Sequence, residues 1–427
     1  MPMLNRQTLN PVFQEVSITA LTPGLLEKFT RLWYACPTDL PDLGKTYSAR
    51  EQGRLEGQAA RLLDGLVFEI KHLPRDPKDR QAIQERIQSA VIAFAKTSLG
   101  VEDRHLELVK KYHFVEIARE FAQKAREFDA SIDSEDIYQA SRNVLTMNFL
   151  QLILDLPVEL TPAVFAYSML YPYTDNYLDD PSISPNAKKL FNDHLRLRLV
   201  GEDMVPMNHS EQAIFDLVKM IENQFDRSHY PQVYENLLAI HLAQTRSLRL
   251  HRGLHLGATS PYEVDVLGLS FEKGGMAVVA DGCLVAGSLL PIQAEFMYGY
   301  GVFTQLIDDL EDLARDRQDG ILTLFTHTSR AWKLDAITNQ LFNLGTQVFT
   351  LMEPFASPVS LEFKELIARC INPLLIDSAT QSPAFYNRPY LKNIETHLPF
   401  RPAFLAKQRR KLEHQKLSAI KLFDGLI

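Results

Sequence analysis

Apolar residues recur along most of the chain at intervals of three and four positions. The clearest examples are Leu62, Leu63, Leu66, Val67, Ile70 and, further on, Val91, Ile92, Phe94 and Ala95. This spacing places the apolar side chains on one face of an α-helix. Runs of alternating β-branched and polar residues, which are typical of strands, are scarce in the sequence. The pattern therefore predicts an all-α protein.

Clear helix boundaries occur in the middle of the chain. Thr161 followed by Pro162 is a favourable helix start, because threonine can cap the first turn and proline fits the first helical position. Pro181 ends this segment, so we predict a helix over residues 162–180. Pro172 removes one backbone hydrogen bond inside it and predicts a kink. Pro231 opens another predicted helix.

Three further helical segments are predicted after residue 259. The segment 260–263, with the sequence Ser-Pro-Tyr-Glu, is a capping box that opens a helix. This helix is predicted to end at Gly274 and Gly275, and a second helical segment restarts at Met276. Pro291 then opens a long helix that ends at Gly320.

The first 130 residues are helical in pattern but carry several proline-marked interruptions, at Pro37, Pro41, Pro74 and Pro77. We therefore predict accessory N-terminal helices over residues 1–130 and a main helical domain over residues 131–427. The accessory helices could form part of the same domain.

Composition narrows the function classes and the compartment. The chain of 427 residues has 45 basic and 53 acidic residues and a net charge of −8, which argues against a nucleic-acid-binding protein. Its three cysteines are far apart in the sequence, so we expect neither a zinc motif nor a disulfide framework. We find no signal peptide, and the uninterrupted apolar piece 282–294 is too short to span a bilayer. We expect a cytoplasmic protein.

Two clusters of acidic residues are the main candidates for chemistry. In the first cluster, Asp175 and Asp179 are four residues apart and share one face of the predicted helix. The second cluster contains a ladder of aspartates spaced by four residues, together with one aspartate beside its first member. The complete set is Asp175, Asp179 and Asp180 in the first cluster and Asp308, Asp309, Asp312 and Asp316 in the second.

Repulsion within these clusters suggests a role in binding cations. Like charges at this spacing destabilise a helix by roughly 0.2–0.5 kcal/mol per pair, so a compensating charge is expected. Mg²⁺ prefers oxygen ligands and is often held by one or two carboxylates together with substrate phosphates. Two carboxylate-bearing helices that face each other could thus bind a diphosphate through metal ions. The alternative interpretation is a pair of solvated acidic helix faces.

The clusters resemble the metal-binding motifs of class I isoprenoid synthases. The sequence Asp-Asp-Leu-Glu-Asp at 308–312, preceded by Phe-Thr-Gln, is similar to the second Asp-Asp-x-x-Asp motif of this superfamily. The spacing of Asp175 and Asp179 is similar to the first motif in its squalene-synthase-like form. Residues 271–275, Phe-Glu-Lys-Gly-Gly, resemble a segment in which a helix breaks and places a lysine near the diphosphate. The resemblance covers roughly residues 135–400.

This resemblance implies an all-α bundle around a central apolar cavity, with three Mg²⁺ ions and a prenyl diphosphate as substrate. The seven aspartates above would be the metal ligands, with Asp180 and Asp316 ranked after the other five. Residues predicted to contact the diphosphate are Lys273, Arg246 and Arg388. Residues predicted to line the substrate pocket are Tyr167, Tyr171, Met297, Gly301, Thr304 and Gln305, although core packing is the alternative role for most of them.

Differences from the family motifs affect which reaction of this class we expect. The first motif has no adjacent aspartate pair at its start, and no Arg-Arg follows it, which weakens the case for chain elongation. Our first hypothesis is ionisation of a prenyl diphosphate followed by cyclisation or elimination. Prenyl transfer, by elongation or head-to-head coupling, is the alternative within the class, and a non-catalytic helical scaffold is the alternative outside it. A basic C-terminal helix over 405–422 could touch a membrane surface, and a homodimer is also allowed.

Overall fold

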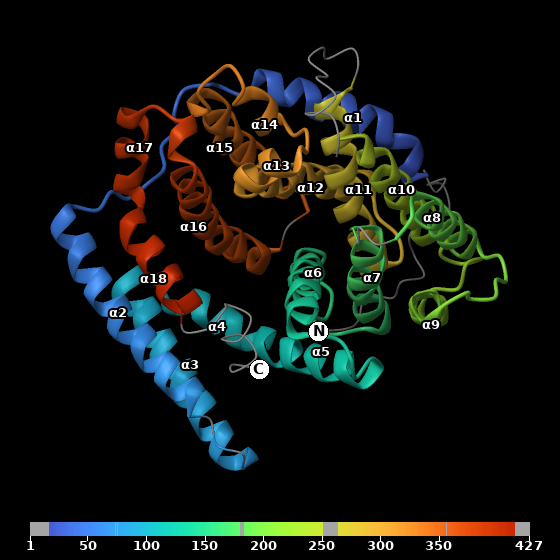
Figure 1. The fold of residues 1–427 in the computed structure, drawn as a ribbon, viewed down its shortest axis with the longest axis horizontal. Coiled ribbons are helices and arrows are strands. Elements are labelled where there is room, and N and C mark those ends of the chain that lie inside the picture. Colours follow the sequence, from blue (N-terminus) through green and yellow to red (C-terminus); the bar gives the residue numbers. More distant parts are fainter. Residues whose placement is uncertain are drawn as a thin grey trace.

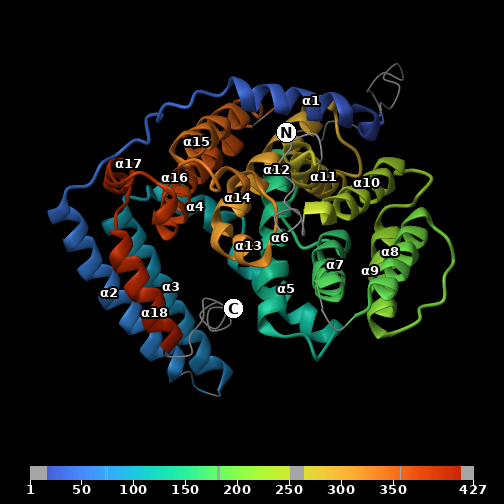
Figure 2. The same ribbon diagram turned by 45° about the horizontal axis from the view of Figure 1, so that its top comes forward.

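The computed structural model describes residues 17–414 apart from 73, 75, 180–182, 251–263 and 356. All regular elements within these residues are helices, which confirms the predicted all-α class (Figures 1 and 2). In chain order the α-helices are α1 Ile18–Ala35, α2 Ala49–Lys71, α3 Pro77–Leu99, α4 Asp103–Lys111, α5 Phe114–Phe128, α6 Ser134–Ile153, α7 Pro162–Asp179, α8 Pro185–Val200, α9 His209–Gln224, α10 Pro231–Ser247, α11 Val266–Ala286, α12 Pro291–Glu311, α13 Leu313–Asp319, α14 Leu324–Thr328, α15 Asp335–Thr350, α16 Pro358–Gln381, α17 Arg388–Ile394 and α18 Pro402–His414.

Helices α11 and α12 form the centre of the main bundle. They pack against each other along most of their length, and α11 also packs against α10, α6, α7 and α1. Both helices are apolar on nearly every side, as expected for helices enclosed by other helices. Phe271 on α11 and Phe296, Tyr298 and Phe303 on α12 are fully buried.

Glycine residues allow α11 and α12 to approach each other closely. A Cβ atom added to Gly301 would lie 2.0 Å from the carbonyl oxygen of Gly274, and one added to Gly275 would lie 2.5 Å from the ring of Tyr298. The predicted helix break at Gly274 and Gly275 is therefore wrong, because both residues lie inside the continuous helix α11. These glycines serve the contact between the helices and do not end α11.

Several predicted helix boundaries are confirmed. Helix α7 begins at Pro162, where the hydroxyl of Thr161 accepts a hydrogen bond from the Val164 amide at 3.2 Å. Helices α10 and α12 begin at Pro231 and Pro291. The predicted start of a helix at 260–263 lies outside the described residues. Helix α11 itself begins only at Val266, after the capping residue Asp265.

The predicted helix over 291–320 consists of two helices. The chain leaves helical geometry at Asp312, so α12 and α13 meet at that residue. The amide of Asp312 still bonds the carbonyl of Asp308 at 2.9 Å, and the amide of Asp316 bonds the carbonyl of Asp312 at 2.8 Å. Helix α13 ends before Gly320, whose φ of 75° is favoured by glycine. The aspartate ladder thus crosses a junction between two helices.

The N-terminal helices lie in two different surroundings. Helix α1 packs against α10, α11, α12 and α15, and its Phe29 and Trp33 are buried in the main core. Helices α2 and α3 lie instead beside α18 at one side of the molecule (Figures 1 and 2). Stacking of Phe94 on Phe400, with ring centroids 6.2 Å apart, joins α3 to the segment before α18. No helix in the described ranges combines the length and the apolar character that crossing a membrane would require.

Candidate functional site

The second acidic cluster lies at the C-terminal end of α12 and on α13. The Asp308 side chain is 55% exposed, whereas Asp309 and Asp316 are each only 6% exposed. Asp312 lies at the junction between the helices and forms an ion pair with Arg315 at 2.5 Å. The cluster therefore combines one accessible carboxylate with two carboxylates that are nearly enclosed by protein.

Asp309 is the most constrained carboxylate of the cluster. The side-chain amide of Gln305 donates a hydrogen bond to its Oδ1 at 2.9 Å. Its Oδ2 is buried and has no hydrogen-bond partner among the described residues. Burial raises the pKa of Asp309 to about 7, and the charges of Asp316 and Asp308 act in the same direction. A buried carboxylate oxygen without a donor is a suitable ligand for a hard cation such as Mg²⁺.

The pKa values of the two other aspartates are also raised. Burial raises the pKa of Asp316 to about 6, and the neighbouring charge of Asp312 contributes to the increase. Desolvation raises the pKa of Asp308 as well, because protein surrounds this carboxylate even though water reaches it. In each case the nearby positive charges do not cancel the effect of burial on the carboxylate. A bound cation would therefore stabilise its ionised form.

Two cations from other helices face this cluster. Nη2 of Arg142 on α6 lies 3.7 Å from Oδ1 of Asp308. The charge of Lys273 on α11 lowers the pKa values of Asp308, Asp309 and Asp316 relative to burial alone. The structure thus brings Lys273 to the acidic cluster, although as part of a continuous helix and not at a helix restart.

Arg142 is a functional candidate that the sequence analysis missed. It is one of many arginines on amphipathic helices, and it belongs to no recognisable motif. Its position became apparent only from the packing of α6 beside α7 and α11. No local sequence signal could have identified it, because its partner Asp308 lies 166 residues further along the chain.

The first acidic cluster is only partly described. Asp175 and Asp179 lie in the last turns of α7, which packs against α6 and α11, but their side chains are outside the described parts of the structure, as is Asp180. Among the side chains that are described, no three His, Cys, Asp or Glu residues are grouped as a metal centre. A metal site shared by both clusters therefore stays a prediction.

The other predicted diphosphate contacts have different surroundings. Arg246 forms an ion pair with Glu272 at 2.6 Å, so its charge is already partnered in this structure. Arg388 is the exposed first residue of α17. Neither arginine is among the charges that influence the acidic cluster, whereas Lys273, which follows Glu272, is.

The predicted pocket residues fall into two groups. Met297 and Gly301 are buried in the contact between α11 and α12, where Met297 occupies the space beside Gly282. For Gly301 the structure favours the alternative role of core packing, because the backbone of α11 fills the space beside it. The remaining four residues keep accessible surface, and these are Tyr167, Tyr171, Thr304 and Gln305.

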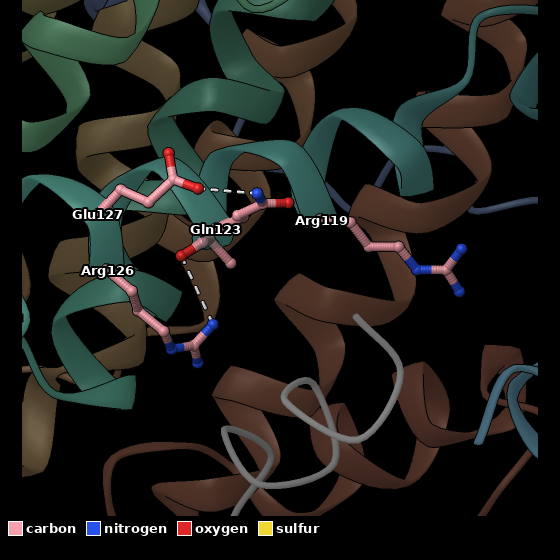
Figure 3. Close-up of a pocket in the computed structure, with 5 residues that line it drawn as sticks. Arg119, Gln123, Arg126 and Glu127 are labelled. Carbon is pink, nitrogen blue, oxygen red and sulfur yellow. Dashed lines mark hydrogen bonds between the residues drawn. The ribbon is translucent and has the colours of Figure 1, made fainter. Parts of the chain in front are cut away.

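Two surface recesses lie outside the two acidic clusters. The larger, of about 490 Å³, lies on α5 and is lined by Arg119, Ala122, Gln123, Arg126 and Glu127 (Figure 3). Within it, the Gln123 amide donates to Glu127 at 2.8 Å, which fixes both side chains along the helix. The smaller recess, of about 140 Å³, includes Asp265, Gly268 and Glu272 near the start of α11.

No family model, curated protein or solved structure matches this chain. The functional argument therefore depends on the geometry and charges of the site.

Proposed function

We propose that the protein is a Mg²⁺-dependent enzyme that ionises a prenyl diphosphate and releases diphosphate, followed by cyclisation or elimination. One observation carries the proposal. Lys273 of α11 and Arg142 of α6 converge on carboxylates of α12 and α13, one of which has a buried oxygen without a donor. Cations beside acids are suited to a ligand that contains both metal and phosphate.

The residues of the cluster have distinct proposed roles. Asp308, Asp309 and Asp312 would hold metal ions, together with Asp175 and Asp179 of α7, while Asp316 and Asp180 would support them. Lys273 and Arg142 would contact the diphosphate oxygens through charge-assisted hydrogen bonds. When bound, Mg²⁺ supplies positive charge that stabilises the leaving diphosphate. The partial accessibility of Asp308 leaves a route for the ligand to reach this set.

The proposal is tested by incubating the purified protein with farnesyl and geranylgeranyl diphosphate, with and without Mg²⁺. We expect Mg²⁺-dependent release of diphosphate and a hydrocarbon or alcohol product. Asp308→Asn should reduce the release by about 100-fold or more, because an electrostatic contact to the reacting group is lost. Asp319→Asn is the matched control, since Asp319 is an exposed acid at the end of α13.

The same experiment separates the alternative functions. A longer diphosphate that forms only when isopentenyl diphosphate is added would indicate chain elongation. A coupled product from two identical diphosphates would indicate head-to-head transfer. Absence of Mg²⁺-dependent diphosphate release from every substrate would contradict the proposal and favour a helical scaffold.

A further inference from the structure

Another buried carboxylate lies inside the main bundle, outside the acidic cluster, and has no role in the proposed function described above. Asp281 is in the middle of α11 and is only 3% exposed. The side-chain amide of Asn143 on α6 lies 3.3 Å from Asp281 Oδ1 and also 3.3 Å from the hydroxyl of Ser168 on α7. Burial raises the pKa of Asp281 to about 8, and the contact with Asn143 lowers it only in part. An acid in such surroundings is costly for folding, so a functional reason is expected.

Aromatic side chains and two partly accessible residues lie near this carboxylate. Tyr300 of α12 is near enough for the Asp281 charge to contribute, after burial, to raising its pKa to about 12. The Tyr300 ring lies 5.5 Å from Phe149, 6.0 Å from Phe296 and 5.9 Å from Phe349, measured between centroids. Tyr300 and Asn143 nevertheless retain accessible surface. Aromatic faces stabilise a nearby cation by about 0.5–2 kcal/mol each.

Helix α6 links this interior position to the acidic cluster. Arg142 reaches Asp308 at 3.7 Å, and the next residue, Asn143, reaches Asp281 at 3.3 Å. Two successive residues of one helix therefore contact the proposed diphosphate site and the interior carboxylate. A prenyl chain whose diphosphate is bound near Arg142 could extend from there towards Tyr300 and Asp281.

We propose that Asp281 is the internal base that ends the reaction by taking a proton from the prenyl carbocation. This inference rests on the proposed function. In the ionised form of Asp281, which predominates above about pH 8, a carboxylate oxygen forms a bond to a hydrogen on the carbon next to the cationic carbon. The C–H electron pair becomes the second bond of a new C=C double bond, and the cation becomes a neutral olefin. Asp281 is left as a carboxylic acid, which returns its proton to water. A carboxylate in poorly hydrated surroundings is a stronger base than one in water.

The variant Asp281→Asn tests this role, because it preserves the shape of the side chain and its hydrogen-bond acceptor but removes the base. With farnesyl diphosphate and Mg²⁺ above pH 8, where Asp281 of the wild type is ionised, we expect diphosphate release to stay within about threefold of wild type. Olefin formation per diphosphate released should fall about tenfold or more. The cation would then be captured by water, so an alcohol should replace the olefin. Ser270→Ala, at another buried polar position on α11, is the matched control and should leave the product ratio unchanged.

The outcomes are distinguishable. An unchanged ratio of olefin to alcohol in Asp281→Asn, with normal diphosphate release, would overturn the role of Asp281 and leave the proposed function intact. No diphosphate release by the wild-type protein would refute the proposed function and, with it, this inference. Circular dichroism checks the fold of the variant. If Asp281→Asn does not fold, Asp281→Ser is judged by the same product ratio.

Discussion

Neutralising Asp309 should stabilise the protein while abolishing the metal-dependent activity that we propose. The pKa of this buried carboxyl rises from an ordinary value of 3.8 to about 7. Each unit of pKa shift corresponds to 1.36 kcal/mol, so the ionised carboxylate costs at most about 4 kcal/mol of folding free energy above pH 7. Asp309→Asn removes this cost and keeps the oxygen that accepts the hydrogen bond from Gln305.

The pH dependence of this effect has a definite sign. Between about pH 4 and pH 7 the folded protein keeps a proton on Asp309 that the unfolded chain has already released. The free energy of unfolding of the wild type therefore falls as the pH rises through this window, and the cost is constant above it. The stability difference between Asp309→Asn and wild type should grow by about 2 kcal/mol from pH 5.5 to pH 8.

Denaturant unfolding at pH 5.5 and pH 8, in buffers free of divalent ions, measures this difference. Adding Mg²⁺ at pH 8 should stabilise the wild type and leave Asp309→Asn nearly unchanged, because the variant lacks the charged ligand. Asp319→Asn is the control, since its carboxylate is exposed at the end of α13. A variant Asp309→Asn that is less stable than wild type at pH 8 without Mg²⁺ would refute the reasoning.

Three other substitutions test separate parts of the structure. Gly301→Ala should lower the free energy of unfolding by about 3 kcal/mol, because its new methyl group would meet the backbone of α11 at 2.0 Å. Denaturant unfolding measures this loss. The control is Gly65→Ala in α2, where a methyl group meets nothing within 4 Å and should stabilise the protein. Lys273→Met should weaken the binding of inorganic diphosphate with Mg²⁺ by about tenfold, as measured by calorimetry, and equal affinity would exclude Lys273 from the site. Arg401→Met should destabilise the protein by about 1–3 kcal/mol, because it leaves the buried Glu56 carboxylate without the guanidinium that donates to it at 2.8 Å. Diphosphate release should be unchanged in folded Arg401→Met, and a loss of release would show that Arg401 belongs to the site.

The helix boundaries that were predicted correctly depend on local interactions. Thr161 caps the first turn of α7, and Pro162, Pro231 and Pro291 occupy first helical positions, so a few neighbouring residues determine each start. The break predicted at Gly274 and Gly275 failed for a different reason. Glycine can end a helix or admit a neighbouring backbone, and only the position of α12 decides between these roles.

The candidate site shows the same division between local and distant information. The acidic cluster was recognisable because its members are close in sequence, and Lys273 was found through its resemblance to a family segment. Arg142 and Asp281 were not found as site residues, because each acquires its role from residues on other helices. The sequence could not decide between a pocket role and a packing role for Gly301, because a small residue beside a cavity and a small residue in a helix contact look identical in sequence.

The balance of charge around the acidic cluster supports a divalent cation more directly than the net charge of the whole protein does. Residues 308–319 contain six acidic side chains and two arginines. Arg315 pairs with Asp312 inside the cluster, but Arg317 donates to the Ser329 hydroxyl and lies over the ring of Phe385. Even with Lys273 and Arg142 added from other helices, negative charge exceeds positive charge. Burial is the main cause of the raised pKa values of Asp309 and Asp316, and the neighbouring negative charges add to it. The same carboxylates that destabilise the metal-free fold should therefore bind a cation most strongly when ionised.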